Sequence, residues 1–198
     1  MARMPPTTSP VIPAGRLSAL EQPVLPGPGG LTLRPWTLDD VPALVTAYAD
    51  PAIQEWHGFR MEREDEAREM IKRWLDGWAA ESSAAWAVIR SGDGSGDGEV
   101  VGRMGLREMN LRWGRAECAY WTMPAARGTG VGPRALAALA AWAFDSGFHR
   151  LWLRHSTANL ASCRVAVKAG FAGEGTERSS ELHPDGWHDM HVHARIDT

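Results

Sequence analysis

Residues 115–146, RAECAYWTMPAARGTGVGPRALAALAAWAFDS, combine a predicted strand, a glycine-rich loop and a predicted helix. Three glycines, Gly128, Gly130 and Gly132, occupy alternate positions of the loop directly before the helix. Within the helix, apolar residues recur at the spacing of one buried face, and Gly147 follows as a stop signal. Glycine costs conformational entropy, so it is kept where the backbone turns left-handed or where a ligand approaches closely. The segment therefore predicts a helix N-terminus that is open to an anion.

Hydrophobic periodicity divides the rest of the chain into further strands and helices. Strands are predicted at 31–36, 85–90, 99–106, 115–122, 150–157, 171–179 and 189–196, and helices at 37–50, 63–81, 133–146 and 159–170. The polar segment SGDGSGDG, residues 91–98, predicts a long hairpin loop. Residues 1–30 are rich in proline and glycine and show neither period, which predicts a flexible arm outside the fold. Together these features predict one mixed α/β domain over residues 31–198.

Composition limits the classes of partner and compartment. With 198 residues, of which 44% are hydrophobic, the chain is long enough for one buried core and hardly for two. A net charge of −3 gives no general attraction to nucleic acid or an anionic membrane, and no apolar run approaches the length of a membrane span. The two cysteines, Cys118 and Cys163, lack metal-ligand spacing and suit a reducing compartment. We therefore expect a cytoplasmic protein with no nucleic-acid or membrane partner.

The glycine loop can be compared with phosphate-binding patterns. A P-loop requires a lysine directly after its last glycine, and no lysine lies between Lys72 and Lys168. Gly130, Gly132 and Ala135 formally satisfy the dinucleotide pattern GxGxxG/A, but the next strand does not end in the acidic residue that this motif needs. A tight turn without a ligand stays open, although three glycines exceed what a turn requires.

A third pattern, R/Q-x-x-G-x-G/A, is met by Arg127, Gly130 and Gly132. With this loop the chain resembles the GNAT superfamily of acyl-CoA-dependent N-acyltransferases, in which the loop wraps the pyrophosphate of CoA. Residues 159–171, NLASCRVAVKAGF, resemble a second segment of that family, N-x-x-S/A followed by K-x-G-F. The similarity covers residues 31–196 and is most specific over 116–171.

Within the superfamily the chain looks most like the RimL/RimJ branch, which acetylates N-termini of ribosomal proteins and includes relatives with other acceptors. The opening LTLRPWTLDD, the pair Tyr120 and Trp121, and the closing DGWHDMHVHARI carry this similarity. The resemblance implies an α+β, three-layer GNAT-like fold, with a central, mostly antiparallel, twisted sheet of about six to seven strands flanked by helices. A splayed central parallel pair would form the CoA site. A homodimer is compatible with this architecture.

The activity implied by the resemblance is direct transfer of an acetyl group from the co-substrate acetyl-CoA to a primary amine, without a metal. The acceptor would be a protein N-terminus or a small amine. An alternative is a non-catalytic acyl-CoA-binding sensor or interaction module. It is suggested by Ala166, which stands where many superfamily members carry the tyrosine that protonates the leaving thiolate.

The resemblance also assigns positions that bind acetyl-CoA. They lie at the end of one strand, in the glycine loop and at the start of a later helix: Trp121, Thr122, Met123, Arg127, Gly128, Thr129, Gly130, Val131, Gly132, Asn159 and Ser162. Asn159 also fits the role of a helix N-cap. Because Ala166 is no acid, Ser162 is the expected contact to the sulfur, with a purely structural role in the first helical turn as the alternative.

Two carboxylates are candidates for the general base that deprotonates the amine. Glu181 is expected between the last two strands, where the similar branch carries a glutamate, and a solvated loop carboxylate is the alternative. Glu117 begins the strand before the CoA site, and alternation places it on the face of Ala119 and Trp121. Ordered water is a further alternative, because an amine of near-neutral pKa can lose its proton to it.

Three histidines near the C-terminus raise the question of a metal site. His188, His191 and His193 lie close in sequence, and the last two share a strand face. The group lacks a nearby cysteine or a third ligand on another element, so we expect core or surface histidines and no metal. His155 is expected to be a satisfied core residue, with a place in the acceptor pocket as the alternative.

Overall fold

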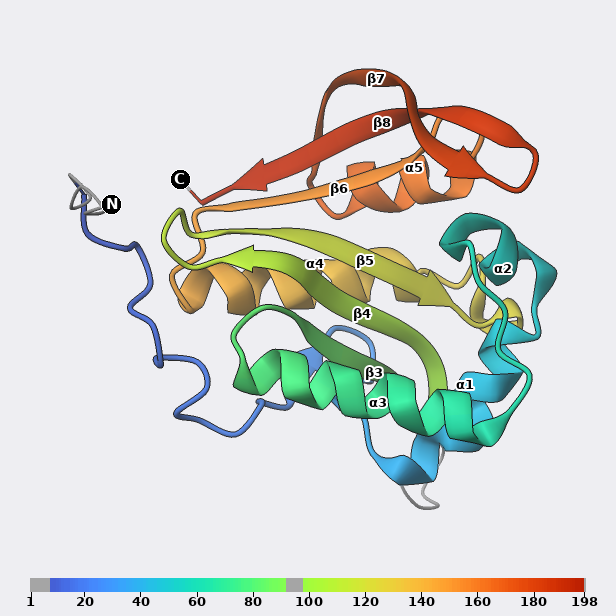
Figure 1. The fold of residues 1–198 in the computed structure, drawn as a ribbon, viewed down its shortest axis with the longest axis horizontal. Coiled ribbons are helices and arrows are strands. Elements are labelled where there is room, and N and C mark those ends of the chain that lie inside the picture. Colours follow the sequence, from blue (N-terminus) through green and yellow to red (C-terminus); the bar gives the residue numbers. More distant parts are fainter. Residues whose placement is uncertain (1–7, 92–97, 198) are drawn as a thin grey trace, which may run out of the picture.

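The computed structural model describes residues 8–91 and 98–197, which form a single eight-stranded sheet with helices on both faces (Figure 1). In chain order the strands are β1 (Leu25–Gly27), β2 (Leu31–Pro35), β3 (Ala84–Arg90), β4 (Glu99–Asn110), β5 (Arg115–Thr122), β6 (Arg150–Ser156), β7 (Ala172–His183) and β8 (Gly186–Ile196). The helices are α1 (Val41–Tyr48), α2 (Pro51–His57), α3 (Glu64–Ala79), α4 (Val131–Asp145) and α5 (Leu160–Lys168), with short 3-10 turns at Leu38–Asp40 and Pro124–Ala126. The predicted α+β class is confirmed.

The sheet is antiparallel except at its centre. Its spatial order is β1-β2-β3-β4-β5-β6-β8-β7, and β5 and β6 are the parallel neighbours. Their pairing runs from Arg115 opposite Arg150 to Glu117 opposite Trp152, whereas both strands continue beyond it. The predicted parallel pair is therefore confirmed, and the two strands separate after Glu117. Such a gap leaves backbone groups of both strands available to a ligand.

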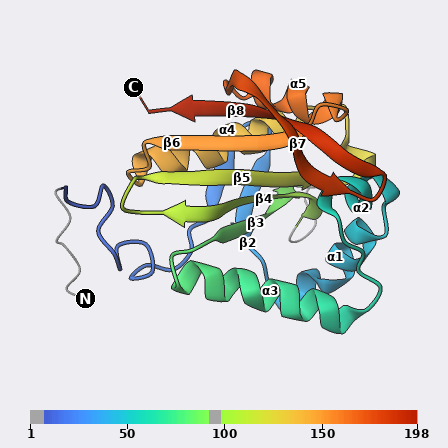
Figure 2. The same cartoon turned by 45° about the horizontal axis from the view of Figure 1, so that its top comes forward.

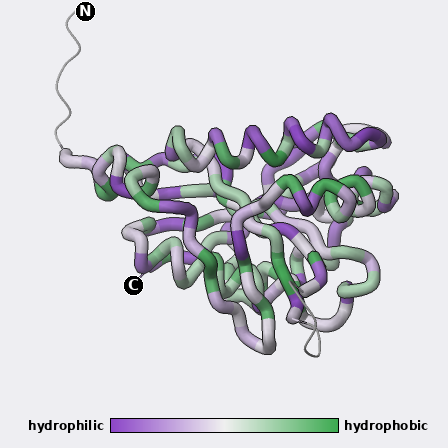
Figure 3. Tube along the Cα trace, turned by 90° about the horizontal axis from the view of Figure 1, so that it is seen from below, coloured by the Kyte–Doolittle hydropathy of each residue, from purple (hydrophilic) through white to green (hydrophobic). Residues whose placement is uncertain are grey.

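Three layers follow from the alternation of apolar side chains along the strands. On one face, Trp86, Met104 and Leu106 pack with Leu136 and Leu139 of α4 in the larger core. The opposite face is covered by α1 and α3, whose apolar side chains form a second core with β3. Figure 2 shows α3 below the sheet, beneath β2 and β3, and α4 behind β5 and β6, and Figure 3 shows hydrophobic and hydrophilic residues alternating along the helices. Among the described residues, no helix is long and apolar enough to cross a membrane.

Residues 8–30 differ from the expected arm, because they pack onto the domain. Ile12 and Leu17 are buried in the larger core, and the carboxylate of Glu81 accepts three N–H groups from this segment. β1 pairs with β2 as an edge strand, so the sheet has eight strands where six to seven were predicted. The few apolar residues here are too widely spaced to show a period, which is why the sequence pattern hid them. The expectation for residues 1–7 lies outside the described part of the chain.

Helix α2 was not predicted. It has only seven residues, and the Asp50 side chain caps it by accepting the N–H of Ile53. Helices this short owe their stability to tertiary contacts more than to an intrinsic pattern. The expected hairpin loop joins β3 and β4, but its residues 92–97 lie outside the described ranges.

Candidate active site

A cavity of about 460 Å³ lies where β5 and β6 separate. Its wall combines the end of β5, the glycine loop, α5 and α2. Nine of the eleven expected CoA-binding residues line it: Trp121, Thr122, Arg127, Gly128, Gly130, Val131, Gly132, Asn159 and Ser162. The other two have local partners instead. The Met123 N–H donates to the Val101 carbonyl (2.9 Å), and the Thr129 hydroxyl donates to the Ala126 carbonyl (2.8 Å).

The glycine loop opens the N-terminus of α4 toward this cavity. Gly128 (φ +76°) and Gly130 (φ +81°) have left-handed backbone conformations that other residues adopt at a cost. Arg134 of α4 donates to the carbonyl oxygens of Gly130 (3.0 Å) and Thr129 (3.1 Å). Arg134 thus occupies these carbonyl oxygens. The N–H groups of the first turn of α4 have no partner within the helix, so the N-terminus of α4 can bind an anion.

Gly132 is needed for a different reason. A Cβ atom there would lie 3.2 Å from a methyl carbon of Val165 on α5 and 3.5 Å from the hydroxyl of Thr122. The absence of a side chain lets α4 and α5 approach each other closely beside the cavity. Gly132 therefore allows the close packing of α4 against α5, whereas Gly128 and Gly130 allow the left-handed backbone of the loop.

Arg127 is held in place by an ion pair. Its guanidinium binds the Asp50 carboxylate (2.5 Å) and donates to the Thr122 carbonyl (3.2 Å). Burial raises the pKa of Asp50, but the hydrogen bonds from Arg127 and the Ile53 amide outweigh it and hold this pKa below its ordinary value. Because Asp50 caps α2, the ion pair connects α2 to the glycine loop. An anionic ligand of Arg127 has to compete with Asp50.

Ser162 meets a tyrosine that the sequence analysis did not assign to the chemistry. Its Oγ lies 2.8 Å from the Tyr120 hydroxyl, and both residues line the cavity. The Asn159 side chain caps α5 by accepting the Ser162 N–H (3.0 Å), so the N-cap interpretation of Asn159 describes the observed contact. The cap therefore uses the backbone N–H of Ser162 and not its hydroxyl. Burial raises the pKa of Tyr120 well above its usual value, so its hydroxyl keeps its proton.

His57 of α2 closes the cavity beside Tyr120. Its Nε2–H donates to the Tyr120 carbonyl oxygen (3.1 Å). Burial and the positive charge of Arg103 together lower the pKa of His57 to about 4, although the hydrogen bond to Tyr120 opposes this shift. The ring is therefore neutral at pH 7 and positions the backbone of β5 without adding charge.

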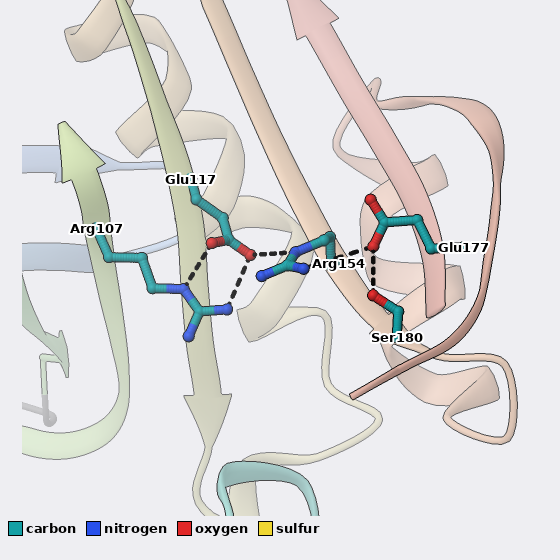
Figure 4. Close-up of polar contacts among 5 residues, drawn as sticks. All are labelled: Arg107, Glu117, Arg154, Glu177 and Ser180. Carbon is teal, nitrogen blue, oxygen red and sulfur yellow. Dashed lines mark hydrogen bonds and ion pairs between the residues drawn. The ribbon is translucent and has the colours of Figure 1, made fainter. Parts of the chain in front are cut away.

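Glu117 lies at the point where the two central strands separate, in a chain of ion pairs (Figure 4). Its side chain is 0% exposed, and Arg107 binds both of its oxygens at 2.8 Å. Arg154 reaches the same carboxylate at 3.3 Å and Glu177 at 3.5 Å, and Ser180 donates to Glu177 at 2.8 Å. A carboxylate has about four lone-pair positions, and three hydrogen bonds already occupy this one. Most of the hydrogen-bonding capacity of Glu117 is therefore used by the two arginines.

Glu181 lies inside β7, opposite His188, rather than between the last two strands as expected. The prediction was wrong because β7 extends to His183 through an irregular pairing with β8. Burial lowers the pKa of Arg107, but the negative charges of Glu117 and Glu181 outweigh it and keep this pKa high. Both candidate bases thus affect the pKa of Arg107, but only Glu117 is bound to it, and Glu181 is the less buried of the two.

The histidines are grouped differently from the expectation. His191 and His193 of β8 meet His155 of β6 and Cys163 of α5, with the potential ligand atoms all within 4.8 Å of one another. His188 instead bonds to other side chains. The premise against a metal site, that no cysteine or third ligand lies nearby on another element, is thus contradicted. The sequence could not show it because the four residues come from three separate elements.

Comparison with known families decides the identity. The model of a family described as an acetyltransferase (GNAT) domain matches residues 30–172. The chain belongs to this family. The predicted identity as an N-acetyltransferase enzyme is confirmed. No curated protein sequence matches the chain closely enough to count as a relative.

Solved structures with the same fold include several N-terminal acetyltransferases. RimL, a ribosomal L7/L12 alpha-N-protein acetyltransferase solved with coenzyme A, is 20% identical with a TM-score of 0.77, covering 88% of this chain and 98% of that one. The Salmonella typhimurium enzyme that modifies the N-terminal serine of L7/L12 is 21% identical with a TM-score of 0.78, covering 89% and 100%. RimJ of Mycobacterium smegmatis, also with CoA, is 20% identical with a TM-score of 0.76, covering 88% and 86%. These likenesses confirm the predicted GNAT fold.

Proposed function

We propose that this GNAT enzyme transfers the acetyl group of acetyl-CoA directly to a primary amine, with Ser162 and Tyr120 receiving the leaving thiolate. The observation that carries the proposal is the 2.8 Å contact between the Ser162 and Tyr120 hydroxyls in the wall of the cavity. The pair joins β5 to α5 in the wall of the cavity that the glycine loop also lines. If acetyl-CoA binds there, the glycine loop would bind its phosphates, and Ser162 and Tyr120 would lie near its sulfur.

Acetyl-CoA is expected to enter along the glycine loop. The N–H groups at the start of α4 would bind the pyrophosphate, and Arg127 would exchange Asp50 for a phosphate oxygen. Backbone groups at the end of β5, which no longer pair with β6, would bind the amides of pantetheine and polarise the thioester carbonyl. Asn159, which lines the cavity, would contact the same part of the co-substrate.

The reaction requires three events. A neutral amine attacks the thioester carbonyl and forms the C–N bond, and backbone N–H groups stabilise the oxyanion that develops. The tetrahedral intermediate then expels the thiolate as the C–S bond breaks. The Ser162 hydroxyl donates a hydrogen bond to the sulfur while it accepts one from the Tyr120 hydroxyl, so both keep their protons and the leaving thiolate takes its proton from solvent. The amine loses its proton to a base on the acceptor side.

Glu181 is our first candidate for that base, with Glu117 second and ordered water third. Glu181 is partly exposed and lies within reach of the charge of Arg107, whereas the oxygens of Glu117 are occupied by two arginines. Arg107 is bound to Glu117 alone, while Glu181 acts on it only through its charge. Glu117 then acts as the anchor that positions Arg107.

We infer that the acceptor is a primary amine, and a protein N-terminus is the first class to test. The structural neighbours that act on ribosomal proteins support this choice by fold alone. Small amines form the second class. The alternative function, an acyl-CoA-binding sensor without turnover, is favoured by Ala166, because the tyrosine common in the superfamily is absent there.

The test combines calorimetry with acetyl-CoA and a thiol-release assay on a panel of N-terminal peptides and small amines. Binding with turnover on any amine supports the enzyme, and binding without turnover on the whole panel supports the sensor. A folded protein that binds no acetyl-CoA would overturn both. A homodimer, compatible with the family, is checked in the same preparation by light scattering.

A further inference from the structure

Four side chains with metal-binding atoms meet beneath α5. His155 comes from β6, Cys163 from α5, and His191 and His193 from β8. Figure 1 shows α5 lying across these strands on the side of the sheet that also carries α4. None of the four lines the acyl-CoA cavity, which opens on the other side of α5. We name these residues the His/Cys cluster.

The ring of His155 is prepared as a ligand. Its Nδ1–H donates to the Ser156 carbonyl oxygen (2.9 Å), which leaves the lone pair on Nε2. That Nε2 is buried and has no hydrogen-bond partner among the described residues, although the side chain is only 4% exposed. A buried polar atom without a partner costs about 1–3 kcal/mol, so a native structure normally supplies it with one. His155 is one of the four residues whose potential ligand atoms lie within 4.8 Å of one another.

His193 has the same arrangement. Its Nδ1–H points to the Phe171 carbonyl oxygen (3.4 Å), and its Nε2 faces the Cys163 sulfur at 3.9 Å. Because Nδ1 carries the proton, the thiol of Cys163 donates to Nε2. Metal-binding histidines commonly donate their second ring nitrogen to a backbone carbonyl, which fixes the ring and the tautomer. Two rings of the cluster show this outer contact.

We propose that the His/Cys cluster binds one transition-metal ion, with Zn²⁺ as the first candidate, through three imidazole nitrogens and one thiolate. Three nitrogens and a sulfur suit tetrahedral zinc, with Zn–N of about 2.0 Å and Zn–S of about 2.3 Å. Such a site spaces its ligand atoms about 3.3–3.8 Å apart. The observed atoms lie within 4.8 Å of one another, so side-chain movements of about 1 Å would complete it. On binding, the Cys163 S–H bond breaks, the proton leaves to solvent and the thiolate binds the metal.

The site would be structural. Four protein ligands leave no open position for a substrate, which is the pattern of structural zinc sites. The ion would join α5 to β6 and β8, and α5 carries Asn159 and Ser162 on its cavity side. Metal binding would thus fix the helix from below. This proposal does not depend on the acceptor or on turnover.

The experiment uses the full chain stripped with a chelator and titrated with Co²⁺ and then Zn²⁺, without CoA. We expect one metal per chain, a thiolate-to-cobalt charge-transfer band that Zn²⁺ abolishes, and a higher Tm with metal. Cys163→Ser should lose the band, and His191→Gln should weaken binding about 100-fold or more. Matched controls are Cys118→Ser and His188→Gln, which remove the other cysteine and a neighbouring histidine and should bind like wild type.

Absence of metal binding by the folded wild-type protein would overturn the proposal. So would an unchanged charge-transfer band in Cys163→Ser, or equal loss of binding in the His188→Gln control. Because His191 is only partly buried, His191→Gln gives a second reading should Cys163→Ser fail to fold. A failure here leaves acetyl-CoA binding to be judged by its own calorimetry, so the two proposals fail separately.

Discussion

The contact between Ser162 and Tyr120 gives the sharpest prediction about mechanism. If Ser162 donates to the thiolate in the transition state, Ser162→Ala removes a hydrogen bond to a charged atom, worth about 1.5–3 kcal/mol. That corresponds to a kcat about 10- to 100-fold lower, with the Kd for acetyl-CoA little changed. Tyr120→Phe removes a bond between neutral hydroxyls, worth about 0.5–1.5 kcal/mol, so kcat should fall about 2- to 10-fold.

The double variant tests whether the two hydroxyls act in series. If Tyr120 acts on the sulfur through the Ser162 hydroxyl, Tyr120→Phe should have no further effect on kcat in the Ser162→Ala background, because the bond between the two hydroxyls is already lost and only the bond from Tyr120 to the Ser162 carbonyl oxygen remains. The coupling free energy would then equal the whole effect of Tyr120→Phe, about 1 kcal/mol. Thiol release at saturating acetyl-CoA measures kcat, and calorimetry measures the affinity of the same four proteins.

A control is available because the chain has just two tyrosines. Tyr48→Phe alters a buried tyrosine of α1 and should leave kcat unchanged. Normal kcat in Ser162→Ala would refute the role of the serine. Additive losses in the double variant would refute the relay and leave the hydroxyls acting independently.

Four further predictions follow from the same contacts. Gly130→Val forces a branched side chain into a left-handed conformation (φ +81°) and should raise the calorimetric Kd for acetyl-CoA at least tenfold, about 1.4 kcal/mol; equal affinity would favour a plain turn. Asp50→Asn keeps a capping side chain on α2 but frees Arg127, so the same measurement should give a Kd about 2- to 5-fold lower. Unfolded histidine binds a proton below pH 6.5, whereas folded His57 does so only near 4, so stability should fall by up to about 3 kcal/mol between these pH values. Urea unfolding should show this loss reduced in His57→Gln and unchanged in the control His149→Gln. Glu181→Gln should remove the acidic limb of the pH profile of kcat/KM, and an intact limb would assign the proton to Glu117 or water.

The sequence predicted the parts of the fold whose pattern is local. Residues 63–81 have an amphipathic period, and α3 occupies Glu64–Ala79 within them. The strand, loop and helix at 115–146 became β5, the glycine loop and α4, because alternation and glycine spacing are properties of neighbouring residues. The nine predicted residues that line the cavity come from this segment and from the start of α5.

What the sequence did not reveal depends on contacts between distant segments. Tyr120 and Ser162 are separated by 42 residues. A signal existed, since alternation places Tyr120 on the same face as the buried Cys118, toward α4 and α5, opposite to Glu117. The partners of Glu117 could not be read in this way, because Arg107 and Arg154 reach it from two neighbouring strands whose register only the folded sheet defines.

Helix α5 shows why the candidate site depends on such distant contacts. Successive residues of a helix point about 100° apart, so Ser162 faces the cavity while Cys163 faces β6 and β8. A helix of nine residues is too short to be stable alone, so the position of the Ser162 hydroxyl depends on what holds the helix. Three contacts do so: the Asn159 cap at its start, the close approach of Val165 to Gly132, and the His/Cys cluster beneath Cys163. A hydrogen bond to a departing sulfur is lost with a shift of about 1 Å, so the residues beneath α5 matter to the chemistry above it.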